Sequence, residues 1–102
     1  MMLAQFSVTP VGVGEGLAER VAELMRIIDG SGLDYRFNAM STIVEGEWDE
    51  VMGLIKRCRD EARLAADRVL VHIAVDDRAG AAGRIDGKVM DVEAVLGRRL
   101  SR

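Results

Sequence analysis

The side chains best suited to chemistry in this sequence are neutral hydrogen-bonding groups, and one carboxylate lies close to them. They are Ser7, Thr9, Asn38, Ser41, Thr42 and His72, with Glu45 as the nearby carboxylate. Hydroxyl, amide and neutral imidazole groups can donate and accept hydrogen bonds. Such a set suits the edge of a neutral or cationic heterocycle, with Glu45 as a counter-ion, and it suits a phosphate poorly. The sequence therefore predicts a binding site for a small molecule.

Patterns typical of catalytic or metal centres are missing. His72 is the only histidine and Cys58 the only cysteine, and neither has a partner at metal-ligand spacing. No nucleophile elbow or triad order is present. We expect no metal, no cofactor and no enzyme activity. His72 is interpreted first as a hydrogen-bonded residue of a subunit interface, with proton transfer left open. Cys58 is expected to be a buried, inert thiol.

A glycine-rich run precedes the first predicted helix and could suggest a phosphate-binding loop. Gly12, Gly14 and Gly16 have suitable spacing, but position 17 is Leu17 and no Gly-Lys-Ser/Thr sequence follows. Both known phosphate-loop patterns therefore fail, and a structural turn is favoured.

The acidic residues after the central strands do not match a calcium loop either. Asp49 and Glu50 suit the positive N-terminal end of a helix. Glu45 and Glu47 are expected instead on the polar face of the sheet. Two interpretations of Trp48 stay open: it packs at the start of the helix, or it stacks on a flat ligand.

Hydrophobic periodicity gives the order of the elements. Strands are predicted at 3–9, 33–38, 42–46 and 69–75, helices at 17–28 and 49–65, a loop at 76–87 and a short C-terminal helix at 89–100. This β-α-β-β-α-β order predicts a single α+β domain over 1–102, a ferredoxin-like sandwich. Two helices would cover one face of a four-stranded antiparallel sheet.

Alternation within the strands divides their residues between the two faces of that sheet. The helix side is predicted to hold Phe6, Val8, Tyr35, Phe37, Val44, Val69, Val71, Ile73 and Val75. The other face is predicted to hold Gln5, Ser7, Thr9, Arg36, Asn38, Ile43, Glu45, His72 and Asp76. Strict alternation turns Thr42 inward, so we expect it to reach a ligand only from the reversal before the strand. Apolar side chains mixed into the polar face favour assembly with a second copy.

Composition narrows the classes of partner. The formal net charge of −3 argues against nucleic acid, whose phosphates need a basic surface. No apolar run approaches the roughly 20 residues of a membrane span. The first residues lack the basic start and apolar run of a signal peptide, so a cytoplasmic location is expected.

Several motifs resemble those of one known family. They are Pro10-x-Gly12-x-Gly14, Gly32-Leu33-x-Tyr35, Met40-Ser41-Thr42-x-x-Glu45-Gly46 with an acidic helix start after it, Asp76-Asp77-Arg78, and the segment from Lys88 to Val95. Together they cover nearly the whole chain and are similar to the thiamine-binding protein family, also called UPF0045 or DUF77. The Met40 to Gly46 motif is the most specific of them.

The resemblance implies a ferredoxin-like fold and a homo-oligomer, commonly a tetramer. It also implies a non-enzymatic protein that binds thiamine or a related aminopyrimidine, through Ser41, Thr42 and Glu45 of the matching motif. Ala39 stands where many relatives have proline. The alternative hypothesis is a structural or interaction module whose polar sheet face is only an oligomer interface, with no ligand.

Overall fold

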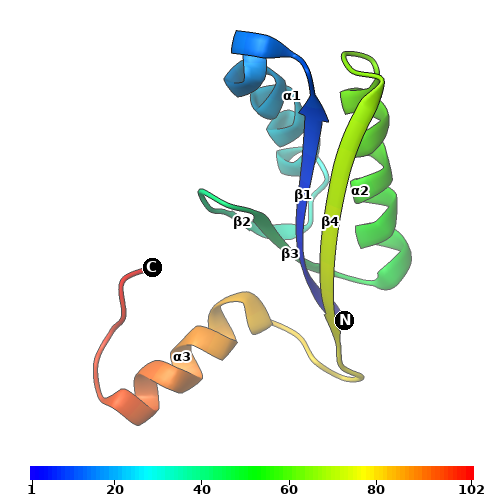
Figure 1. Cartoon of the computed structure of the whole chain (residues 1–102). Coiled ribbons are helices and arrows are strands. Elements are labelled where there is room, and N and C mark those ends of the chain that lie inside the picture. The colour runs from blue at the N-terminus through cyan, green and yellow to red at the C-terminus, as the bar shows by residue number, and fades with distance from the viewer.

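The computed structural model describes all residues, 1–102 (Figure 1). Its elements are β1 (Met2–Val11), a 3-10 turn η1 (Gly14–Gly16), α1 (Leu17–Asp29), β2 (Asp34–Phe37), β3 (Thr42–Gly46), α2 (Trp48–Arg63), β4 (Arg68–Asp77) and α3 (Arg84–Leu96). The strands form one antiparallel sheet in the order β2-β3-β1-β4. This arrangement confirms the predicted ferredoxin-like α+β fold.

The hydrophobic core lies between the sheet and the two helices α1 and α2. Both helices carry an apolar stripe, which packs on the inward-facing residues of β1 and β3. Leu54, Val44, Val51 and Cys58 are among the most completely buried side chains. The full core comprises Met2, Ala4, Phe6, Val8, Leu24, Ile28, Val44, Val51, Leu54, Ile55, Cys58 and Ala62.

The strand register fixes which residues share a face, because directly opposed residues of paired strands point the same way. Phe6 pairs with Thr42 on one side and Ile73 on the other, which places all three on the helix-covered face. Ser7 pairs with His72, and Gln5 pairs with Ile43 and Ala74, on the opposite, open face. The predicted division between the faces is confirmed for every residue within the strands. Asn38 lies outside them, in the turn after β2.

β3 is much shorter than the strand beside it. β3 pairs with β1 only from Met2 to Phe6, whereas β4 pairs with β1 along its whole length, to Val11. From Ser7 onward, β1 therefore has a strand on one side only. The first strand was predicted to end at residue 9, but β1 continues to Val11 and Pro10 lies within it, opposite Val69. A proline is tolerated there because it needs no partner on the unpaired side.

β4 forms an exposed edge of the sheet. Val71, Ile73 and Val75 share the helix-side row, yet they remain 38%, 41% and 40% exposed, because α2 packs mainly on β1. Leu70, on the open face, is also 41% exposed. A long edge strand with apolar side chains on both faces is a surface that proteins usually cover.

The last helix differs most from expectation. The predicted loop at 76–87 is too long, because β4 continues to Asp77 and α3 already begins at Arg84. α3 extends away from the sheet and its helices, as Figure 1 shows, and none of its residues is buried. The radius of gyration is 15.0 Å, against about 13 Å for a compact chain of this length. None of the helices has the length and apolar character that crossing a membrane requires.

Candidate functional site

A cavity of about 180 Å³ lies beside β1, next to Thr42, the first residue of β3. α1 and the turn between β2 and β3 close its sides. Its lining residues are Phe6, Ser7, Val8, Thr9, Val21, Leu24, Met25, Ile28, Phe37, Asn38, Ala39, Met40, Ser41, Thr42 and Cys58. None of them is charged, so the cavity combines an apolar interior with neutral hydrogen-bonding groups. This combination is typical of sites that hold a small organic molecule.

The unpaired length of β1 forms one wall of the cavity. Ser7, Val8 and Thr9 line it, and they lie just beyond the last residue of β1 that pairs with β3. In an antiparallel strand, every second residue directs its backbone N–H and C=O towards the same neighbouring strand. The backbone groups that would have bonded to a longer β3 thus have no strand partner. Such groups are obligatory donors and acceptors, and a bound ligand could satisfy them.

The turn between β2 and β3 forms the opposite wall. The Asn38 backbone N–H donates to the Ser41 carbonyl at 2.9 Å, which closes a tight turn. Met40, at its tip, is 88% exposed. Phe37 was expected in the core, but it is 56% exposed, because β2 is a short edge strand and an open hollow lies between Phe37 and α1. Phe37 instead lies at the rim of the cavity.

The structure brings together five of the residues predicted from sequence. Ser7, Thr9, Asn38, Ser41 and Thr42 all line the cavity. No hydrogen bond within the chain uses any of their side chains. These donors and acceptors are therefore free to meet a ligand.

Thr42 reaches the cavity by a different route from the one expected. It is the first residue of β3, is 5% exposed and follows strict alternation, so it points to the helix side. We had expected it to need a position outside the alternation. The cavity itself lies on the helix side, however, and the inward orientation is the one that reaches it.

His72 lies outside this cavity, on the open face of β4. It lines a shallower, more open depression with Gln5, Ser7, Ser41 and Ala74 among its neighbours. Its ring makes no hydrogen bond within the chain. The interpretation of His72 as a hydrogen-bonded residue is thus not met within one copy of the chain.

Glu45 is not brought to the cavity. It points to the open face, as predicted, but it is 5% exposed because the start of α3 covers it. Its Oε2 accepts a hydrogen bond from the Arg84 backbone N–H at 2.9 Å. The first amides of a helix have no partner inside the helix, so this carboxylate satisfies one of them. Within one copy of the chain Glu45 anchors α3 and does not line the cavity with Ser41 and Thr42.

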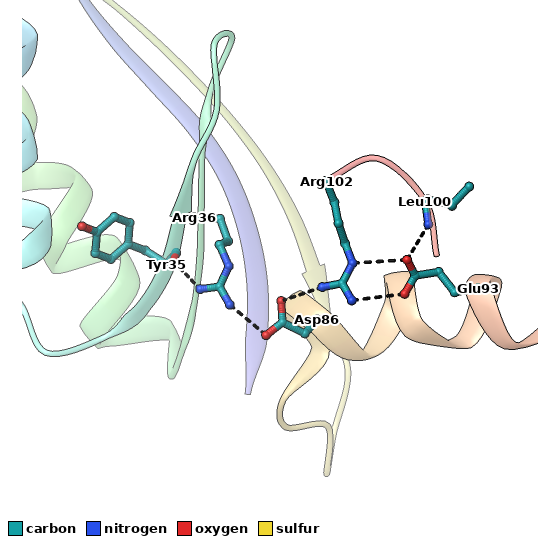
Figure 2. A network of polar contacts seen from close by, with 6 residues as sticks. All are labelled: Tyr35, Arg36, Asp86, Glu93, Leu100 and Arg102. Carbon is teal, nitrogen blue, oxygen red and sulfur yellow. Dashed lines mark hydrogen bonds and ion pairs between the residues drawn. The ribbon is translucent and has the colours of Figure 1, made fainter. Parts of the chain in front are cut away.

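Further polar contacts hold α3 and the tail that follows it. Figure 2 shows Arg36 of β2 paired with Asp86 at 2.8 Å, while Arg102 bridges Asp86 and Glu93. The Leu100 backbone N–H donates to Glu93 at 2.6 Å and, with Arg102, holds the pKa of that carboxyl below its usual value. On the other side Lys88 donates to Asp76 at 2.7 Å and lowers its pKa. α3 is attached to the sheet by hydrogen bonds and ion pairs, without a buried apolar contact.

Glu47 and Trp48 belong to the start of α2 and not to the cavity. Glu47 was expected on the polar sheet face, but its backbone N–H donates to the Glu50 carboxylate at 3.2 Å, an arrangement typical of a capping box. Trp48 is the first residue of the helix and is 51% exposed, away from the cavity lining. No group of three or more His, Cys, Asp and Glu residues could hold a metal ion.

Sequence reasoning missed the apolar part of the lining. Val21 and Met25 of α1, and Cys58 of α2, belong to helical stripes that pack on the sheet. Periodicity assigns such residues to the core without telling which of them face a gap. Burial raises the pKa of the Cys58 thiol to about 11, so this thiol lines the site in its neutral form. The signal that could have found the site is the unequal length of the first and third strands.

The sequence model of the thiamine-binding protein family matches residues 4–93. The chain belongs to the thiamine-binding protein family. Within the family it is 43% identical over 96 residues to the UPF0045 protein of Mycobacterium bovis, an alignment that covers 93% of this chain and 94% of the relative. The UPF0045 protein of Synechocystis is 30% identical over 96 residues, covering 93% of this chain and 79% of that protein.

Solved structures agree with the family assignment. The match to a hypothetical protein of Methanocaldococcus jannaschii has a TM-score of 0.80 at 25% identity and covers 89% of this chain and 94% of that one. A DUF77 domain of Bacillus cereus gives 0.79 at 27% identity and 88% of both chains. A Thermotoga maritima protein, described as a candidate thiamine biosynthesis or salvage protein, gives 0.78 at 25% identity and covers 89% and 97%. The fold of this family member is thus that of its relatives.

Proposed function

We propose that this family member is a non-enzymatic binding protein whose ligand is thiamine or a related aminopyrimidine. The observation that supports it most is the uncharged cavity, whose lining combines apolar residues with five polar residues, the side chains of which make no hydrogen bond within the chain. The family bears the name of a thiamine-binding protein, and a solved relative is described in terms of thiamine biosynthesis or salvage.

The cavity chemistry favours a flat, neutral heterocycle. The unpaired edge of β1 offers a row of backbone donors and acceptors, which suits a ring whose edge carries both kinds of group. Phe6, Val8 and Leu24 offer apolar surface for the ring itself. A fully charged group would lose its hydration there without gaining an opposite charge, which is costly. An aminopyrimidine fits these requirements, and an anion does not.

The catalytic alternative has less support. A general acid or base must lie within hydrogen-bond reach of the reacting group. Asn38, Ser41 and Thr42 offer only neutral groups at ordinary pH, and the buried Cys58 thiol is held protonated by its raised pKa. The lining of the cavity thus suits recognition better than bond-making chemistry.

We also propose that the protein self-associates, as a homo-oligomer and most simply as a tetramer. Two surfaces support this: the exposed apolar row of β4 and the unburied helix α3. Val92, Val95 and Leu96 of α3 are 50%, 88% and 53% exposed, which is costly for a helix that stays uncovered. A second copy could cover both surfaces.

Calorimetric titration tests the binding proposal. Thiamine and its pyrimidine part, 4-amino-5-hydroxymethyl-2-methylpyrimidine, are titrated separately into the purified protein. We expect saturable heat with at least one of them. Absence of heat and of any thermal shift with both compounds at millimolar concentration would overturn the proposal. Chromatography of the samples after the titration measures whether either compound has been consumed. Consumption would show that the protein is an enzyme.

A further inference from the structure

The cavity beside β3 is small for a complete ligand. Its volume is about 180 Å³. Sites for organic ligands usually occupy roughly 300–1,000 Å³. The space beside Thr42 and Asn38 therefore suits one six-membered ring with small substituents. Any larger group attached to such a ring must lie outside it.

A second space begins where the cavity opens to the surface. This depression on the open face has a volume of about 430 Å³ and is lined in part by Gln5, His72 and Ala74. It shares Phe6, Ser7, Met40 and Ser41 with the cavity. The shared residues flank the gap that the short β3 leaves beside β1. A molecule could therefore pass from the helix side of the sheet to its open face around the end of β3.

The two spaces differ in chemistry. The cavity contains no ionisable group other than the neutral Cys58 thiol. The depression is open to water and contains His72. A further hollow on the same face shares Gln5 and Ala74 with it, and Asp76 is among the residues that line that hollow. A charged or strongly polar group keeps its hydration more easily in the depression than in the cavity.

We propose that the ligand is a two-part molecule that this site divides between the two faces of the sheet. A neutral, planar ring occupies the cavity. A second ring or polar group, which can be cationic, extends between Ser7 and Met40 and lies on the depression against His72 and Ala74. This inference rests on the proposed function. It implies that His72 and Ala74 contact the second part of the ligand and not the ring in the cavity.

Titration of matched variants tests the division. Ala74→Tyr fills the depression from an exposed strand position that tolerates an aromatic residue. Val21→Phe narrows the cavity from the surface of α1. Leu70→Tyr places the same aromatic ring on the same face of β4, outside the depression, and serves as the control. Thiamine and the free aminopyrimidine are the probes, and size-exclusion chromatography checks the folding and assembly of each variant.

We expect Ala74→Tyr to weaken thiamine binding about tenfold or more, because the added ring takes the space of the second part of the ligand. Binding of the aminopyrimidine should stay within about twofold of the wild type, because the aminopyrimidine does not reach the depression. Val21→Phe should weaken both probes by a similar factor, and Leu70→Tyr neither. Equal effects of Ala74→Tyr on both probes, or no effect on either, would overturn the division while the binding proposal stands. Absence of binding of both probes to the wild-type protein would overturn the proposed function and this inference with it.

Discussion

Thr42 belongs to the hydrophobic side of the sheet and to the candidate site at once. Its alternation places it beside Phe6 and Phe37, and the end of β3 places it on the cavity wall. A hydroxyl in a nearly buried position is costly unless it finds a partner, so a ligand that accepts its hydrogen bond gains from it. Thr42 is therefore the side chain on which ligand recognition should depend most.

We predict that Thr42→Val weakens binding of the aminopyrimidine by about two- to tenfold, because valine keeps the shape and removes the hydroxyl. One lost hydrogen bond in a site of this kind contributes roughly 0.5–1.5 kcal/mol. Calorimetry gives the affinity, and the thermal midpoint of the free protein serves as the control, since it should not fall. An unchanged affinity would remove Thr42 from the site.

Cys58 gives a prediction for alkaline pH. The pKa of the folded thiol is raised from 9.0 to about 11, because burial disfavours the thiolate. The unfolded chain releases this proton first, so the free energy of unfolding should fall as the pH rises from 9 to 11. Cys58→Ala should show a smaller fall over the same range. Denaturant unfolding at several pH values measures the difference, and parallel curves for the two proteins would contradict it.

At the scale of the elements, Glu45 shows how a residue of the sheet can govern a helix far along the chain. Its carboxylate satisfies the Arg84 backbone N–H, and Arg36 and Asp76 add ion pairs to α3. These exposed ion pairs are weak individually and are screened by salt. The position of α3 thus depends on a few polar contacts, of which the one to Glu45 is the most buried.

We predict that Glu45→Ala loosens α3 and leaves the aminopyrimidine affinity within about twofold of the wild type. Removing the acceptor for a first-turn amide costs about 1 kcal/mol of local stability. Hydrogen exchange at residues 84–88 should become faster, while exchange in α2 stays unchanged. A Glu45→Gln control keeps an acceptor oxygen and should show a smaller effect. Loss of binding with α3 still protected would instead make Glu45 a ligand-binding residue.

Much of this arrangement could be predicted from sequence, because periodicity reports local geometry. The stripe through Leu24 and Ile28 and the alternation through Val44 fix the helix and strand faces. Thr42 and Asn38 were found through their chemistry. Periodicity predicts that β3 is shorter than β1, but it cannot tell that β3 begins opposite Phe6, since the register of pairing depends on contacts far apart in the chain. For the same reason the cavity was expected on the open face, and Glu45 was grouped with Ser41.

On the scale of the whole molecule, one copy leaves large apolar surfaces open to water. α3 contributes nothing to the core, and β4 has backbone groups without a partner along its outer side. Edge strands of this length are usually covered or paired. The principal extents of 46 × 29 × 21 Å describe an elongated chain, and its uncovered surfaces are the basis of the proposed self-association.

We predict that the purified protein has a mass of two or more times 11.1 kDa, the mass of one chain. The Val71→Lys variant should have a smaller mass. A lysine in the middle of the exposed row of β4 would bury a charge at the interface. Light scattering after size-exclusion chromatography gives the masses. Leu64→Lys, at an 81% exposed position at the end of α2, is the control and should not change them. A monomeric wild-type protein would contradict the assembly.

The cavity exists because β3 is shorter than β1. Its size therefore depends more on the length of β3 than on the identity of the side chains around it. Each residue added to β3 would pair with one more residue of β1 beyond Phe6 and reduce the gap. Insertions and deletions in the turn at 38–41 could thus adapt the site to different ligands without repacking Leu54 or Val44. Proteins with the same core could in this way diverge in what they recognise through changes in a single hairpin.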